Sequence, residues 1–169
     1  TEMIAQIQLL GLPDPNNTRQ IILEKIEQIR ELCNTTDSVL LENGGGFRDL
    51  EIRIIETRGG PMVIVHLVVD TRDAMGANAV NSMAEALAPK IEGWTGGRVN
   101  LRILSNLADR RLARARAVWK LEDIGGKQVR EDIIAASWFA EADPSRAATH
   151  NKGIMNGISA VALATGNDT

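Results

Sequence analysis

The sequence has few of the features that define several protein classes. Its 169 residues include a single cysteine, Cys33, which excludes an internal disulfide framework and a multi-cysteine zinc site. The longest apolar run, residues 62–69, is about eight residues long, whereas a membrane-spanning helix needs roughly 20. The formal net charge of −3 lacks the basic excess of a general nucleic-acid binder. We therefore expect no membrane span and no nucleic-acid partner, and one reduced, buried thiol fits a cytoplasmic protein.

The remaining composition is that of a globular protein. Hydrophobic residues make up 44% and charged residues 24% of the chain, and 169 residues suffice for one ordinary domain or two small ones. The chain starts with Thr1 instead of methionine, shows no signal-peptide pattern and closes on a polar stretch, 164–169. These ends predict a piece of a longer protein.

The first 105 residues alternate between strand-like and helix-like patterns. Period-two alternation predicts strands around 5–9, 50–54 and 99–103, and the apolar run 62–69 predicts a central strand. Helical periodicity from Ile22 predicts a helix that runs to about Leu32, after a break with helix-starting polar residues at 13–17, and a second helix over 80–91. A short strand is predicted at 39–41 and a hairpin turn at 57–60. The order βαββαβ indicates an α+β, ferredoxin-like domain with both helices on one face of an antiparallel sheet.

The sequence pattern changes after Ser105. An arginine-rich stretch at 109–116 precedes a predicted strand at 119–124. Glu131 and Asp132 are expected to open a helix, which 143–145 breaks before a second helix begins. These elements are too few to close a core, so we assign 1–105 to one domain and 106–169 to an incomplete part of another.

Six residues form the first motif that could bind a ligand: Asp73, Ala74, Met75, Gly76, Ala77 and Asn78. They follow a buried strand and open a helix, where free backbone N–H groups and the helix dipole favour an anion such as a pyrophosphate. Gly76 permits close approach to the backbone, and Asn78 offers both a donor and an acceptor. The alternative is an ordinary helix start, because the three-glycine dinucleotide fingerprint is absent.

A second motif lies at 146–157. If this segment is helical, Lys152 and Asn156 share a face, and with Arg146 nearby they could hold a carboxylate and a polarised carbonyl oxygen. Asp168 could pair with Lys152 and keep it charged. The alternatives are a polar helix surface and, around Asp168, a simple turn.

Three isolated groups carry less information. Asn106 follows the last strand and is either a turn residue or a ligand contact, while His66 lies in an apolar strand and is expected to be a satisfied buried histidine. His150 adjoins Lys152 without an assigned role. The sequence offers no catalytic Ser/His/Asp set, and we assign no metal site.

Several linked segments together resemble the 3-hydroxy-3-methylglutaryl-coenzyme A reductase family. The segments that carry the resemblance are 60–70, 73–78, 81–86, 101–108 and 146–157. They occur in the family's order and cover nearly the whole chain. Ala77, where class I members have methionine, and the string His150-Asn151-Lys152 are similar to the class II type of bacteria and archaea.

The resemblance implies a two-step reduction in which two hydrides from NAD(P)H convert hydroxymethylglutaryl-CoA to mevalonate and CoA, or the reverse reaction. It implies that Lys152 is the catalytic lysine and Asp168 the catalytic aspartate bonded to it. Arg146, Asn106 and Asn156 would contact the acyl substrate.

The resemblance also implies how the cofactor is held. The stretch 73–78 would lie along the dinucleotide, and Asp37 is a candidate for the adenosine ribose, which would favour NAD over NADP. Residues 1–105 would be the small cofactor domain, and 106–169 part of the large α/β domain that binds CoA. The site would form at the interface of a homodimer or higher oligomer.

Two of the family's catalytic groups have no counterpart in this sequence. They are a glutamate from an upstream segment and a histidine from a mobile C-terminal segment, so we expect this chain alone to be inactive. The alternative from another class is a non-catalytic, small-molecule-sensing ferredoxin-like module, in which Lys152 and Asp168 are surface groups.

Overall fold

The structure is a computed structural model that describes residues 1–167. The chain forms two compact units, the first spanning Thr1–Arg114 and the second beginning at Ala115. Among the described residues, no helix combines the length and the apolarity that crossing a bilayer requires.

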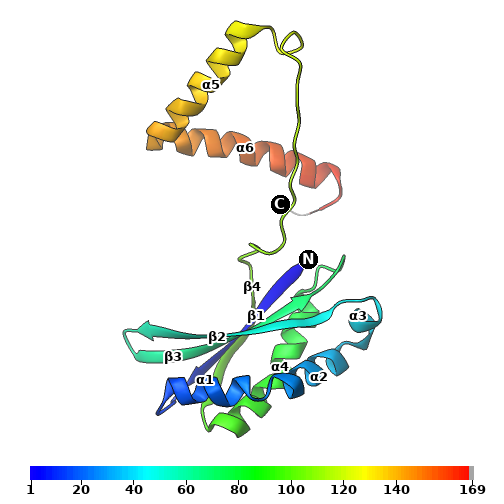
Figure 1. The fold of residues 1–169 in the computed structure, drawn as a ribbon, viewed down its shortest axis with the longest axis vertical. Coiled ribbons are helices and arrows are strands. Elements are labelled where there is room, and N and C mark those ends of the chain that lie inside the picture. The colour runs from blue at the N-terminus through cyan, green and yellow to red at the C-terminus, as the bar shows by residue number, and fades with distance from the viewer. Residues whose placement is uncertain (168–169) are drawn as a thin grey trace. The chain divides into compact units, whose positions relative to one another are not determined.

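The first unit is a four-stranded sheet with four helices (Figure 1). Its elements are β1 (Glu2–Leu10), α1 (Pro15–Leu23), α2 (Ile26–Thr36), α3 (Ser38–Glu42), β2 (Gly46–Thr57), β3 (Gly60–Asp70), α4 (Ala77–Thr95) and β4 (Arg98–Ser105). The strand order is β2-β3-β1-β4, and all neighbouring strands are antiparallel. This is the split βαβ arrangement, so the predicted ferredoxin-like α+β fold is confirmed.

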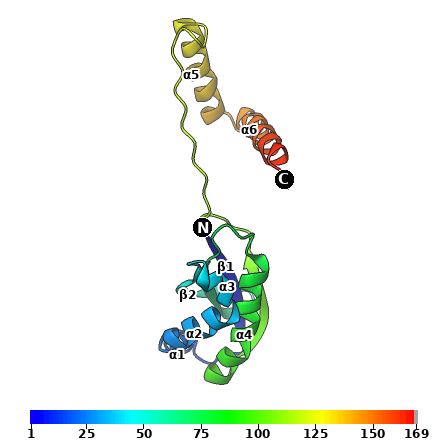
Figure 2. The ribbon, with the colours of Figure 1, turned by 90° about the vertical axis from the view of Figure 1, so that its right-hand side faces the viewer.

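The core lies between one face of the sheet and helices α1, α2 and α4 (Figures 1 and 2). Alternate residues of the central strands point into it, among them Ile7 on β1 and Leu67 on β3, which are fully buried. Helix α4 contributes Met83, Leu87 and Ile91 at helical spacing. Burying each such side chain stabilises the fold by roughly 1.5–3 kcal/mol, so the alternating pattern fixes which face the helices cover.

The opposite face of the sheet carries a polar row. Glu51, His66 and Gln6 stand opposite one another on β2, β3 and β1. His66 is only 6% exposed, and its Nε2 lies 2.9 Å from Gln6 Nε2. Burial lowers the pKa of His66, and the positive charge of Arg53 lowers it further. The expectation of a satisfied buried histidine is confirmed.

Two predictions in the first unit are wrong in detail. The single helix expected at 22–32 is two helices, because the backbone tightens where Lys25 N donates to Ile22 O at 3.0 Å. The strand expected at 39–41 is helix α3, since the Asp37 carboxylate caps it by accepting from Leu40 N at 2.9 Å. Three consecutive apolar residues cannot distinguish a strand from one buried helical turn.

The second unit contains α5 (Lys127–Ala142) and α6 (Pro144–Ala164). Asp143 caps α6 by accepting from Arg146 N at 2.7 Å, which confirms the predicted break. The strand expected at 119–124 is wrong, because residues 115–120 form an extended thread and turns follow it (Figure 2). Helix α5 starts directly after Gly126, so Glu131 and Asp132 do not open it as expected.

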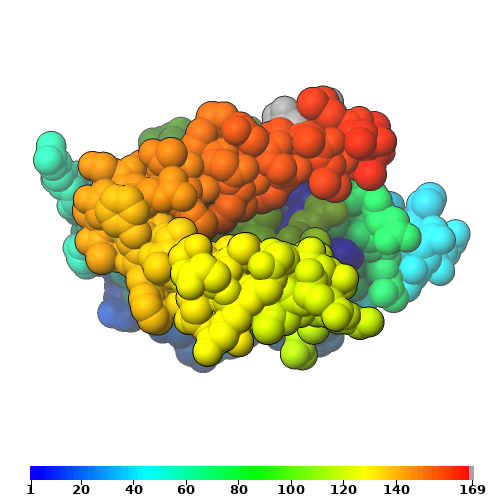
Figure 3. All heavy atoms as spheres, turned by 90° about the horizontal axis from the view of Figure 1, so that it is seen from above, coloured from blue at the N-terminus to red at the C-terminus, as the bar shows by residue number. Residues whose placement is uncertain are grey.

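Neither helix of the second unit has a buried residue. Large apolar side chains are exposed on both, for example Trp138 at 64% and Ile158 at 53%. In the space-filling view, the side chains of α6 (orange to red) lie open to the viewer (Figure 3). Exposed apolar side chains gathered in this way are uncommon on a soluble monomer.

Candidate functional site

The 73–78 loop joins β3 to α4 through two left-handed backbone positions. Arg72 has φ of 52°, and a turn follows in which Ala74 N donates to Thr71 O at 3.0 Å. Gly76 has φ of 86° and is the N-cap of α4. Because a glycine cap has no side chain, α4 lacks the side-chain hydrogen bond that usually closes a helix start.

Gly76 is also the point of closest packing in the loop. A Cβ atom there would lie 2.6 Å from Thr71 Cγ2 and 2.7 Å from Met3 Sδ. The residue is buried, whereas Met75 beside it is 68% exposed. The loop is therefore folded tightly over the ends of β1 and β3 and presents its outer residues to solvent.

The Asp70 carboxylate fixes the start of this region. It accepts from the Thr1 hydroxyl at 3.1 Å, from Arg48 Nη2 at 3.1 Å and from Arg72 N at 2.9 Å. Burial alone would raise the pKa of Asp70, but the hydrogen bonds from Arg72, Arg48 and Thr1 lower it to about 2. Hydrogen bonds to this one carboxylate thereby link the ends of β1, β2 and β3.

A cavity of about 720 Å³ lies beside the loop. It is lined by residues that include Asp37, Asp73 and Ala74, three of the positions that the sequence singles out. Asp37 follows α2 directly and already caps α3 with one carboxylate oxygen. The structure thus brings Asp37 and the first part of the loop together.

Two backbone N–H groups of the loop have no hydrogen-bond acceptor among the described residues. In residues 1–167, neither the Met75 N–H nor the Gly76 N–H donates a hydrogen bond. Ala77 is the first helical residue and Asn78 is exposed in the first turn of α4. Free N–H groups at a helix start donate hydrogen bonds to anions, so these features fit an extended anionic ligand such as a dinucleotide.

The other candidate residues belong to α6 and to the segment after β4. On α6, Lys152 Nζ donates to Asn156 Oδ1, which confirms that the two side chains share a face. Arg146 lines a separate cavity of about 360 Å³ with Thr149 and His150, and neither Lys152 nor Asn156 belongs to it. Asn106 is exposed in the first unit, directly after β4. Asp168 lies outside the described residues.

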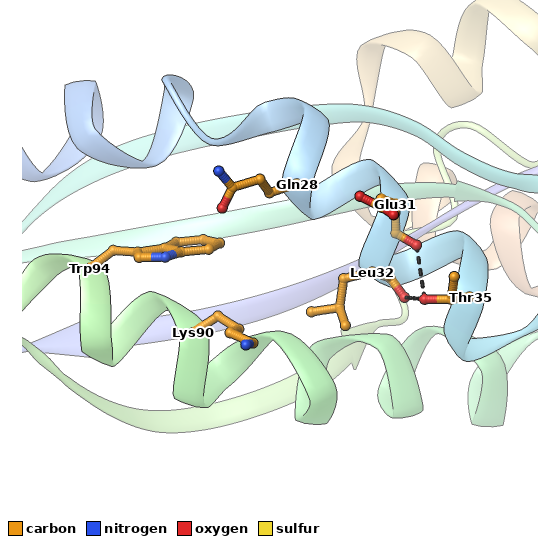
Figure 4. A pocket seen from close by; sticks show the side chains of 6 residues that line it. All are labelled: Gln28, Glu31, Leu32, Thr35, Lys90 and Trp94. Carbon is orange, nitrogen blue, oxygen red and sulfur yellow. Dashed lines mark hydrogen bonds between the residues drawn. The ribbon is translucent and has the colours of Figure 1, made fainter.

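A further cavity, of about 390 Å³, opens between α2 and α4 (Figure 4). Trp94 and Lys90 of α4 face Gln28 and Glu31 of α2 across it. It contains none of the residues that the sequence singles out. Within residues 1–167, no group of three or more His, Cys, Asp or Glu side chains could hold a metal ion.

Comparison with known proteins places the chain in a family. The hydroxymethylglutaryl-coenzyme A reductase family profile matches residues 1–169. The chain belongs to this family. A 3-hydroxy-3-methylglutaryl-coenzyme A reductase from Archaeoglobus fulgidus is 57% identical over 166 residues, which are 98% of this chain and 38% of that protein. A probable reductase from Borreliella burgdorferi is 42% identical, covering 76% of this chain and 30% of its own length.

Solved structures agree. The reductase of Streptococcus pneumoniae has a TM-score of 0.83 at 39% identity, with 99% of this chain and 46% of that chain covered. A class II reductase structure from the same organism, bound to NADPH in open conformations, has a TM-score of 0.82 at 40% identity and the same coverage. The chain spans less than half the length of these members of the reductase family.

Sequence reasoning missed two arginines near the loop. Arg72 lines the cavity beside Asp73, and Arg111 donates to two backbone carbonyls of the loop. Arg111 lies in the arginine-rich stretch that the sequence shows clearly. Its hydrogen bonds to a loop 36 residues earlier in the chain depend on a turn after β4, and the composition of that segment does not predict the turn.

Substituting Gly76 tests the packing at the loop. We expect Gly76→Ala to destabilise the first unit by about 3 kcal/mol, because a left-handed φ costs an alanine roughly 1–2 kcal/mol and overpacking costs roughly 1–3 more. The matched control is Gly11→Ala, where φ is 71° and no atom lies within 4 Å of the added Cβ. Urea denaturation followed by circular dichroism measures both, and equal losses would contradict the crowding at Gly76.

Substituting Asp70 tests the charge that ties the strand ends together. The folded pKa of about 2 lies below the ordinary aspartate value of 3.8, so the carboxylate stabilises the fold above about pH 4. This contribution, about 2 kcal/mol, is lost as the pH falls towards 2. The difference in unfolding free energy between wild type and Asp70→Asn should therefore shrink over that range.

Urea denaturation at a series of pH values measures this difference. The exposed Asp123, changed to Asn, serves as the control and should have little effect at any pH. A difference between wild type and Asp70→Asn that stays constant from pH 7 to pH 2 would rule out a stabilising Asp70 carboxylate.

Proposed function

We propose that the chain is part of a class II hydroxymethylglutaryl-CoA reductase. The reaction consumes two NAD(P)H to convert hydroxymethylglutaryl-CoA to mevalonate and CoA, or runs in reverse. The observation that carries the proposal is the family match over residues 1–169 combined with a cavity shared by Asp37 and the 73–78 loop. Nothing in the match favours the alternative of a non-catalytic sensor.

The first unit is proposed to hold the nicotinamide dinucleotide, which supplies the hydrides. Free N–H groups of Met75 and Gly76 would bind phosphate oxygens, and Ala77 and Asn78 would continue this surface along α4. Asp37 would accept from the adenosine ribose. A carboxylate there repels a 2′-phosphate, so we propose NAD as the preferred cofactor, although one related structure holds NADPH.

The second unit is proposed to carry the reacting groups. Lys152 would stabilise negative charge on the substrate oxygen and assist proton transfer, with Asp168 bonded to it. The hydrogen bond between Lys152 and Asn156 supports this, because it holds the ammonium group at one place on α6. Arg146 and Asn156 would bind the acyl part of the substrate, and Asn106, which belongs to the first unit, is proposed to contact it as well.

We further propose the organisation of the whole protein. Residues 1–105 are proposed to form the small cofactor domain and 106–169 to belong to the large α/β domain that binds CoA, although in the structure 106–114 still belong to the first unit, which ends at Arg114. The exposed apolar side chains of α5 and α6 support a larger domain around them and a homodimer or higher oligomer. A single buried cysteine whose pKa is raised to about 12 by burial suits a reducing cytoplasm.

An activity assay tests the proposal in the longer protein that contains this chain. With hydroxymethylglutaryl-CoA and NADH or NADPH, wild type should oxidise the dinucleotide. Lys152→Ala should lower kcat by about a thousandfold or more, because one charge-stabilising group at the reacting oxygen accounts for roughly 10²–10³ in rate and proton transfer adds to it. Dinucleotide binding by this variant should stay unchanged.

The matched control is Lys127→Ala at the start of α5, which should leave kcat within twofold of wild type. Retained activity in Lys152→Ala would remove Lys152 from its catalytic role. No dinucleotide oxidation by wild type with either cofactor would contradict the proposed function itself.

A further inference from the structure

Residues 106–114, here called the connector, turn back onto the first unit directly after β4. Leu107 N donates to Ser105 Oγ at 3.2 Å, and Arg111 N donates to Ala108 O at 3.1 Å. This tight course brings two consecutive arginines, Arg110 and Arg111, against different parts of the unit. The connector then leads to Ala115, where the second unit begins.

Arg110 anchors the connector on the open face of the sheet. Its guanidinium forms an ion pair with Glu51 of β2, and a second nitrogen lies 3.7 Å from Glu2 Oε2 of β1. Glu51 also lies 3.9 Å from His66 Nδ1. Each acid is about one-third exposed, so a single pair contributes little alone, but contacts to two strands restrict where the connector can lie.

Arg111 reaches the other way, to the 73–78 loop. Its Nη1 donates to Met75 O at 3.0 Å and its Nη2 to Ala74 O at 3.3 Å. The rigid guanidinium fork thus binds two consecutive carbonyls at once, a geometry that lysine cannot reproduce. This contact matters because α4 has no side-chain cap to hold the loop.

The planar trans peptide converts these contacts into an orientation of the loop's donors. When the carbonyls of Ala74 and Met75 are held towards Arg111, the N–H groups of Met75 and Gly76 must point away from it. Those are the donors that carry no hydrogen bond in residues 1–167. Arg111 therefore sets the direction in which the loop offers hydrogen bonds to a ligand.

We infer that Arg111 is a positioning residue for dinucleotide binding: it orients the 73–78 loop from the connector without touching the ligand. The inference rests on the proposed function, since that assigns the dinucleotide to the loop. It adds a link between the cofactor loop and the chain segment that leads to the second unit.

The test uses the longer protein and the variants Arg111→Met and Arg111→Lys. Fluorescence titration with NADH and NADPH gives the Kd of each dinucleotide, and steady-state kinetics gives KM for hydroxymethylglutaryl-CoA. Arg111→Met should raise the Kd of the preferred dinucleotide about tenfold, because it removes the charge-assisted hydrogen bonds that hold a half-exposed loop. KM for hydroxymethylglutaryl-CoA and the melting temperature should stay close to wild type.

Arg111→Lys should raise the Kd by a smaller factor, because one ammonium group binds one carbonyl at a time, and it carries the test if Arg111→Met fails to fold. The matched control, Arg114→Met, removes the same charge from an exposed arginine of the connector and should leave the Kd within twofold of wild type.

Three results would overturn the inference. If wild type binds the dinucleotide and Arg111→Met binds it with the same Kd, the inference is overturned and the proposed function stands. Equal losses in Arg111→Met and Arg114→Met would show a general charge effect instead of positioning. A wild type that binds neither NADH nor NADPH would overturn both the inference and the proposed function.

Discussion

The Asp70 carboxylate is the interaction on which the rest of the candidate site depends. It lies at the end of the central strand β3 and accepts hydrogen bonds from residues of three different chain segments, Thr1, Arg48 and Arg72. The low pKa keeps it charged at any physiological pH, so these bonds persist. The backbone leaves the strand from this fixed point, turns through Arg72 and reaches Gly76, where Thr71 and Met3 leave no room for a side chain.

Much of the fold of the first unit follows from the sequence because one physical rule governs it. Residues such as Ile7 and Leu67 alternate along strands, whereas Met83 and Leu87 recur at helical spacing, and both patterns come from burying one face. The predictions were wrong where no buried face determines the secondary structure. Helix α3 depends on a single carboxylate cap, and 119–124 has apolar residues with no strand to pair with.

The candidate site was predictable in part for the same reason. The 73–78 loop follows a strand and opens a helix, and glycine at position 76 points to a special backbone geometry. Its neighbours in space could not be found this way. Asp37 is named in advance only through the family resemblance, whereas Arg111 reaches the loop through the connector, so the contact of each with this region depends on tertiary structure. The roles of Lys152 and Asn156 stay predictions that rest on the family.

The central claim is that the 73–78 loop binds a nicotinamide dinucleotide through its backbone. Amide hydrogen exchange of the longer protein, read out by mass spectrometry with and without NADH or NADPH, tests it most directly. If the loop binds the dinucleotide, peptides that contain Met75 to Asn78 should exchange more slowly when the dinucleotide is bound. Bound dinucleotide that protects other segments and leaves the exchange of this loop unchanged would show that the dinucleotide binds elsewhere.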